Sequence, residues 1–124
     1  MKRRKFIFST ASVLTGVSFH ARARRSRIRI GQIGLAHPHA LGKLNAIRAL
    51  SGTYDLIGVV EPDLSLRKRA KGVNFISLDQ LMNAKGLEAV AIETRVKDLV
   101  TTALPVVEAG KHIHLDKPAG PALA

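Results

Sequence analysis

Five short strand-like segments, each followed by a helix-forming or turn-forming stretch, run along the chain from residue 27 onward. The segment 54–60 is a near-continuous apolar run, which is typical of a strand buried on both faces of a parallel sheet. Short loops between alternating strands and helices require crossovers that return the chain in the same direction each time. The pattern predicts an α/β fold with a doubly wound, Rossmann-like parallel sheet in strand order 3-2-1-4-5. The predicted strands are residues 27–34, 54–60, 73–76, 87–92 and 111–115.

Local signals place helices between these strands. Ser77 and Gln80 have the spacing of a capping box, in which each side chain satisfies an unpaired amide at a helix start. An apolar face recurs at helical spacing over residues 96–107, and Gly110 then offers the left-handed conformation that ends many helices. Both signals fit the alternating order of strands and helices.

The charge of the chain is concentrated at its N-terminus. The 124 residues carry a net charge of +11, which by itself suggests a nucleic-acid partner. Residues 1–27 hold eight of the 20 Lys and Arg and no acid, whereas residues 28–124 hold twelve against all nine Asp and Glu. The second part is therefore nearly balanced, and with aromatic residues at 4% and no Trp a nucleic-acid-binding function is not expected. The absence of Cys excludes disulfides, thiolate nucleophiles and cysteine-ligated metals.

Residues 1–26 are predicted to be an export signal and a basic linker, followed by one domain over residues 27–124. Four cations at residues 2–5 precede fourteen uncharged residues, and Ala21 and Ala23 supply a small-x-small cleavage motif. The adjacent Arg3 and Arg4 resemble a twin-arginine signal, so we expect export to the periplasm by that route. The apolar run is too short to span a membrane stably, and no span is expected after cleavage. A basic amphipathic arm or an uncleaved anchor are the alternatives.

In a doubly wound sheet, ligands bind beyond the carboxyl ends of the strands, where the strand order reverses. The first predicted strand ends there in a glycine turn that can offer helix-start amides to a pyrophosphate. The turn departs from the G-x-G-x-x-G pattern, because Ala36 and His39 replace the second and third glycines, and a plain strand–helix turn is the alternative. The candidate cofactor-binding residues of this segment are Gly31, Gly34, Leu35, Ala36 and His37.

A second candidate, Glu61, ends the second predicted strand. A carboxylate at this place can accept both ribose hydroxyls of an adenosine and repel a 2′-phosphate, so it favours NAD over NADP. Its alternative role is that of a solvated turn residue. Arg67 and Arg69 lie close in sequence and could receive a 2′-phosphate, which keeps NADP possible, although a solvated helix face is the simpler interpretation of these cations.

Two further pairs follow the fourth and fifth predicted strands. Thr94 and Arg95 come after the fourth strand, beside the point where the strand order reverses, and are candidate cofactor-binding residues. Asp116 and Lys117 come after the fifth. A lysine at a strand end can hydrogen-bond a substrate hydroxyl or assist its proton transfer, so Lys117 is the candidate catalytic residue. Taken alone, it could also be an ordinary surface lysine.

These segments together resemble the N-terminal domain of the Gfo/Idh/MocA oxidoreductases, a family of sugar and cyclitol dehydrogenases. The most specific segment is Ala109-Gly110-Lys111-His112-Ile113-His114-Leu115-Asp116-Lys117-Pro118. The resemblance extends over residues 27–121, and the segments 31–35, 61–63 and 77–81 also contribute to it. Asp116 stands where the family usually has Glu.

The resemblance implies NAD(P)-dependent oxidation or reduction of a sugar or cyclitol carbon, with Lys117 matching the active-site lysine of the family. Family members continue into a second α/β domain that carries the substrate pocket. We therefore expect a truncated, dinucleotide-binding domain that has no turnover alone and meets a sugar-like substrate only when a second domain is supplied. A homo-oligomer is possible.

Two other classes of function are alternatives to an oxidoreductase. One is a metal-dependent hydrolase site built from His37, His39, His112 and His114. It is disfavoured because alternate residues of a strand project from the same sheet face, and the pair at 112 and 114 lies before the strand end; we expect no metal. The other is a non-catalytic nucleotide-binding or interaction module, which the downstream reading frame would distinguish.

Overall fold

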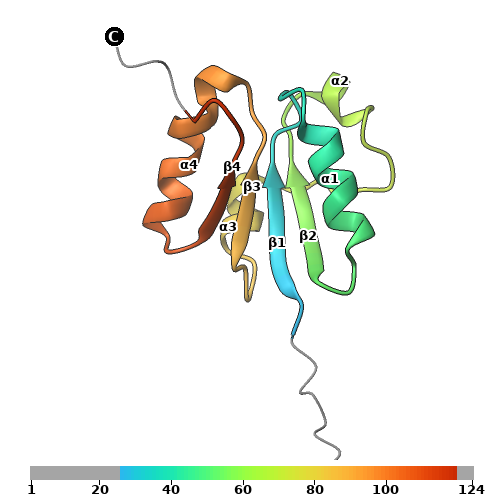
Figure 1. Ribbon diagram of the computed structural model, residues 1–124, viewed down its shortest axis with the longest axis vertical. Coiled ribbons are helices and arrows are strands. Elements are labelled where there is room, and N and C mark those ends of the chain that lie inside the picture. The colour runs from blue at the N-terminus through green and yellow to red at the C-terminus, as the bar shows by residue number, and fades with distance from the viewer. Residues whose placement is uncertain (1–25, 120–124) are drawn as a thin grey trace, which may run out of the picture.

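Four parallel strands form one sheet in the order β2-β1-β3-β4, with helices on both faces (Figure 1). This arrangement is a computed structural model, and it describes residues 26–119. The chain enters at the centre of the sheet in β1, moves outward to β2, and then crosses to the other side of β1 for β3 and β4. The elements are β1 (Ile28–Ile33), α1 (Ala40–Ala49), β2 (Tyr54–Val60), α2 (Leu64–Arg67), α3 (Leu78–Met82), β3 (Ala89–Ile92), the 3-10 turn η1 (Val96–Asp98), α4 (Leu99–Glu108) and β4 (His112–Leu115).

The predicted third strand, residues 73–76, is reduced to a single parallel bridge between Phe75 and Val59 of β2. The amide of Val59 donates to the Asn74 carbonyl at 2.9 Å, and the Ile76 amide donates to the Val59 carbonyl at 3.0 Å. These two hydrogen bonds form one bridge and not a ladder. With this bridge counted at the outer edge of β2, the predicted order 3-2-1-4-5 is confirmed.

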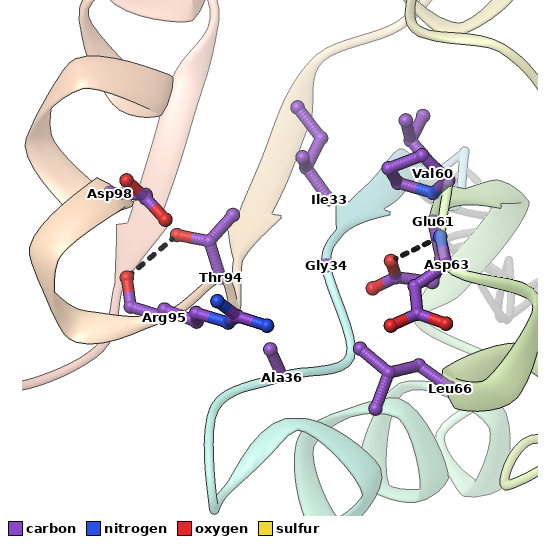
Figure 2. Close-up of a pocket in the computed structure, with 11 residues that line it drawn as sticks. Ile33, Gly34, Ala36, Val60, Glu61, Asp63, Leu66, Thr94, Arg95 and Asp98 are labelled. Atoms are coloured by element: carbon purple, nitrogen blue, oxygen red, sulfur yellow. Dashed lines mark hydrogen bonds between the residues drawn. The ribbon is translucent and has the colours of Figure 1, made fainter.

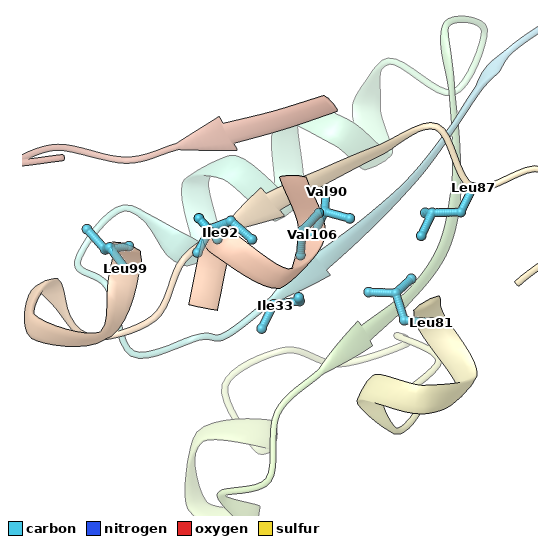
Figure 3. Close-up of a cluster of buried hydrophobic side chains, with 8 residues drawn as sticks. Ile33, Leu81, Leu87, Val90, Ile92, Leu99 and Val106 are labelled. Carbon is cyan, nitrogen blue, oxygen red and sulfur yellow. The ribbon is translucent and has the colours of Figure 1, made fainter. Parts of the chain in front are cut away.

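The larger part of the core lies between the sheet and the α3–α4 side (Figure 3). Alternate residues of a strand point to opposite faces, so Val90 and Ile92 of β3 pack on the α3–α4 side, whereas Ala91 packs with Ile30 and Ile47 on the other face. On the opposite face, Leu44 and Ala40 of α1 pack with Leu35 and Val59. The cluster on the α3–α4 side consists of Ile33, Leu81, Leu87, Val90, Ile92, Leu99, Ala103 and Val106.

The helix ends follow the predicted signals. The Ser77 hydroxyl accepts from the Gln80 amide at 3.1 Å, and the Gln80 side chain accepts from the Ser77 amide at 2.8 Å, which completes the capping box. Gly110 adopts a φ of +74° after α4. Within residues 26–119, no helix is long and apolar enough to cross a membrane. The predicted export signal lies outside the described residues.

Candidate functional site

A cavity opens beyond the carboxyl ends of β1, β2 and β3, where the strand order reverses (Figure 2). It has a volume of about 250 Å³, and Gly34, Ala36, Glu61, Thr94 and Arg95 are among the residues that line it. A second hollow of about 670 Å³ shares six lining residues with this cavity and extends it toward α3 and α4. The two hollows are continuous across the strand ends, and we call them together the groove. The shared residues are Ile33, Val60, Glu61, Pro62, Thr94 and Asp98.

Gly34 joins β1 to the loop before α1 and is confirmed as the tight turn. Its φ is +95°, a conformation that L side chains rarely adopt. A Cβ at this position would lie 2.7 Å from the backbone oxygen of Glu93 and 2.7 Å from the amide nitrogen of Thr94. The turn therefore runs in direct contact with the end of β3, and only glycine permits this approach.

Glu61 is 5% exposed and connects the end of β2 to the glycine turn. Its Oε2 accepts from the Leu35 amide at 2.8 Å, and its Oε1 accepts from the Asp63 amide at 2.9 Å. A carboxylate has about four acceptor positions, so two donors leave capacity for further hydroxyl groups. Glu61 is thus a fixed wall of the groove and not a solvated turn residue.

The cations that follow Glu61 are only partly a solvated face. Arg67 is half-buried: its Nε donates to the Glu61 carbonyl at 2.5 Å, and its guanidinium lies 5.1 Å from the centroid of the Phe75 ring. Arg69 is exposed, with its Nη1 donating to the Leu35 carbonyl at 3.4 Å. Both guanidinium groups therefore contact backbone that borders the groove.

The end of β3 supplies the opposite wall of the groove. Thr94 is half-buried and its Oγ1 donates to the Arg95 carbonyl at 3.2 Å. Arg95 is exposed, and its side chain extends toward Ala36 at the glycine turn (Figure 2). Arg95 also acts electrostatically on Asp63: hydrogen bonds from Ser65 first, and the positive charge of Arg95 among the weaker influences, lower the pKa of the Asp63 carboxyl.

A second polar region, which we call the polar cluster, consists of His37, His39, Glu93 and Asp116. It brings together the loop after β1 and the ends of β3 and β4. His37 Nδ1 lies 3.7 Å from Glu93 Oε2 and 3.6 Å from Asp116 Oδ2, and His39 Nδ1 lies 3.2 Å from Asp116 Oδ1. His37, Glu93 and Asp116 are 3%, 0% and 7% exposed, whereas the side chain of His39 is 56% exposed.

The two carboxyl groups of the polar cluster titrate in opposite directions. Burial, together with the neighbouring Asp116, raises the pKa of Glu93 to about 7. Burial also acts on Asp116, but hydrogen bonds from His39 and from the Lys117 amide outweigh it and hold the pKa of Asp116 below its usual range. Two adjacent acids with such different surroundings favour one shared proton or a shared cation over two free negative charges.

Lys117 is exposed and borders a different hollow from the groove. Its amide donates to Asp116 Oδ1 at 2.8 Å, and its carbonyl accepts from His37 Nε2 at 3.0 Å. Together with His39 and Lys43 it lines a hollow of about 510 Å³ beside α1. The polar cluster therefore holds the backbone of Lys117 on both sides, while the side chain faces this third hollow.

The structure divides the predicted site residues between these regions. The groove is lined by Gly34, Ala36, Glu61, Thr94 and Arg95. The Leu35 amide donates to the carboxylate of Glu61. His37 and Asp116 belong to the polar cluster. Gly31 lies inside β1, where a Cβ would collide with the Leu81 side chain of α3.

Three further polar residues lie in β4 or follow β3. His112 and His114 are exposed. They project from an edge strand with a partner on one side only, which leaves them open to solvent. Glu93 was missed: it directly follows the apolar run of β3, and a carboxylate at that place reaches the same sheet edge as Glu61.

The sequence matches no protein-family profile and no curated protein. The fold, however, matches solved structures of nucleotide-dependent enzymes. The WlbA dehydrogenase from Bordetella pertussis, in complex with NADH and UDP-GlcNAcA, superposes with a TM-score of 0.65 at 21% identity over 77% of this chain and 30% of that chain. KijD10, a 3-ketoreductase from Actinomadura kijaniata in complex with NADP and TDP-benzene, gives 0.64 at 22% identity over 77% and 30%.

An NAD-binding protein from Listeria innocua matches with a TM-score of 0.62 at 22% identity, over 77% of this chain and 28% of that chain. The chain thus spans about 30% of the length of the structures that it matches. These similarities establish the Rossmann-like α/β fold of the described residues.

Proposed function

We propose that residues 27–124 form the NAD(P)-binding domain of a Gfo/Idh/MocA-like oxidoreductase that acts on a sugar or cyclitol hydroxyl or carbonyl. The observation that carries the proposal is the bond from the Leu35 amide to Glu61 Oε2, because it joins the glycine turn and the acid of β2 in one groove at the reversal of strand order. The matching structures with NADH and NADP support this assignment.

The residues present fit a dinucleotide. Gly34 lets the backbone approach a pyrophosphate closely, since no Cβ occupies the space next to Glu93 and Thr94. Glu61 retains acceptor positions for ribose hydroxyls and opposes a 2′-phosphate, which favours NAD. A bound nicotinamide would supply hydride transfer, and Lys117 Nζ would exchange a proton with a substrate oxygen held in the hollow beside α1 that its side chain faces.

Isothermal titration of the full chain with NADH and with NADPH tests the proposal. We expect tighter binding of NADH, and Glu61→Gln should weaken it by about tenfold or more, since a hydrogen bond to a charged group contributes roughly 1.5–3 kcal/mol. Glu108→Gln, at an exposed position of α4, is the matched control and should bind NADH as the wild type does. Tighter binding of NADPH that is lost in Arg67→Ala would contradict the assignment.

We expect the 124-residue chain alone to bind dinucleotide without turnover of a sugar. Holding a substrate in reactive geometry contributes on the order of 7–11 kcal/mol to lowering a barrier, and family members provide this with a second domain. Reduction of NAD by the purified chain in the presence of sugars or cyclitols, abolished by Lys117→Ala, would show that the site is complete within this chain.

We also propose export by the twin-arginine route, on the basis of Arg3 and Arg4 in the segment outside the described residues. A Rossmann-like domain that acquires its cofactor before export must cross the membrane folded, which this route allows. The double change Arg3→Lys and Arg4→Lys should retain the precursor in the cytoplasm, as fractionation and immunoblotting would show. Undiminished export of this variant would contradict the proposal.

A further inference from the structure

Glu93 is fully buried, and neither of its carboxylate oxygens has a hydrogen-bond partner among the described residues. The Oδ2 of Asp116, which is 7% exposed, is likewise unpartnered there. Buried polar groups in folded proteins are nearly always hydrogen-bonded, and a buried charge without a partner is costly. Two neighbouring carboxyl groups with three unpartnered oxygens therefore require either a proton or a cation between them.

From this and from the positions of the histidines, we propose that His37, His39, Asp116 and Glu93 form a binding site for Zn²⁺. One ligand atom each from His37, His39 and Asp116 lies within 4.8 Å of the others. Glu93 reaches this group through His37 and belongs to a second such group with His114 and Asp116. Three pairs of donor atoms lie 3.2, 3.6 and 3.7 Å apart: His39 with Asp116 Oδ1, His37 with Asp116 Oδ2, and His37 with Glu93 Oε2. Bonds of about 2.0–2.1 Å in a tetrahedral arrangement place donor atoms roughly 3.3–3.4 Å apart, so only small side-chain movements are needed.

The surroundings of His37 resemble those of a metal ligand. Its Nε2 donates to the Lys117 carbonyl at 3.0 Å, which leaves Nδ1 as the basic nitrogen that faces both carboxylates. Metal-bound histidines usually donate their second ring nitrogen to a carbonyl or carboxylate in this way. The Nδ1 at present accepts from the His39 amide at 3.1 Å, a contact that the metal ion would replace.

The donor set selects the kind of ion. Two imidazole nitrogens and two carboxylates suit zinc, whereas magnesium and calcium favour all-oxygen sites. The exposed ring of His39 gives an ion access from solvent. Because His39 and Lys117 line the same hollow, the ion would sit at the edge of the space that the Lys117 side chain faces.

The test uses the tag-free full chain, stripped of metal with a chelator and free of dinucleotide. Titration with Zn²⁺ should show one ion per chain, and Co²⁺ should give the visible absorption of a low-symmetry site. His39→Ala and Glu93→Gln should each weaken Zn²⁺ binding by more than about 100-fold. This loss exceeds the roughly 10–100-fold that is typical when a residue that only hydrogen-bonds to a metal ligand is removed. His112→Ala is the matched control, because it removes an exposed histidine of β4 outside the cluster and should leave the affinity unchanged.

Two results would overturn the proposal. Equal Zn²⁺ affinity in His39→Ala and His112→Ala would assign the ion to surface histidines. Absence of Zn²⁺ binding to the folded wild-type chain would assign the polar cluster to a shared proton between Glu93 and Asp116. NADH binding measured on the same samples keeps this test separate from the proposed function, since the groove does not contain the zinc ligands.

Discussion

Glu61 and Glu93 occupy equivalent places on either side of β1, and their surroundings differ in one decisive respect. Each follows directly on a strand, and they are 5% and 0% exposed. Glu61 accepts from two backbone amides, whereas Glu93 has no hydrogen-bond partner among the described residues. A buried carboxylate that is hydrogen-bonded by the backbone forms part of the wall of a groove, whereas one without hydrogen-bond partners has binding capacity that the chain itself does not use.

The largest effect is expected at Gly34, which touches both regions. Gly34→Ala should lower the free energy of unfolding by about 2–4 kcal/mol, because alanine is strained at a φ of +95° and its Cβ would lie 2.7 Å from the Glu93 backbone oxygen. Urea denaturation followed by circular dichroism measures this loss. Gly42→Ala is the control: it lies within α1 with no atom within 4 Å of the new Cβ, and should raise stability by about 0.5–1 kcal/mol. Equal changes in stability in the two variants would contradict the claim that the close approach of the Gly34 turn to β3 requires glycine.

A smaller effect should separate the two glutamates directly. In the presence of chelator, Glu61→Gln should lower the free energy of unfolding by about 1–3 kcal/mol, since one of the two backbone amides that bind the carboxylate loses its acceptor. Glu93→Gln breaks no hydrogen bond and removes a buried charge next to Asp116, so its stability should equal or exceed that of the wild type. The same denaturation series measures both variants. A loss of stability in Glu93→Gln as large as that in Glu61→Gln would contradict the claim that backbone hydrogen bonds stabilise only Glu61.

The last prediction concerns Gly31, which the glycine pattern assigned to the cofactor. Gly31→Ala should cost about 1–3 kcal/mol of stability, toward the lower end, because the Leu81 side chain that meets the new Cβ can shift. NADH affinity, measured by titration on the folded variant, should remain unchanged, since the groove does not include this position. A selective loss of NADH affinity at full stability would return Gly31 to the cofactor site.

Much of the fold could be predicted because its signals are local. The apolar run of β2, the capping box at Ser77 and the cap at Gly110 each depend on residues close in sequence. The strand predicted at 73–76 is a single bridge in the structure, because pairing of a short segment depends on its neighbours in the fold as well as on its own residues. At the groove, Gly34, Glu61 and Thr94 were found by the rule that ligands bind at strand ends.

The sequence by itself determined the order of elements, the parallel sheet and the edge at which polar residues gather, because hydrophobic periodicity and glycine or proline punctuation act over a few residues. Only the tertiary structure decided which polar residues face one another. Glu93, His37 and Asp116 are far apart along the chain, and their contact depends on β3 and β4 lying beside β1 in one register. Hydrogen-bond satisfaction is likewise a property of the packed chain, so no sequence pattern distinguishes the paired Glu61 from the unpaired Glu93.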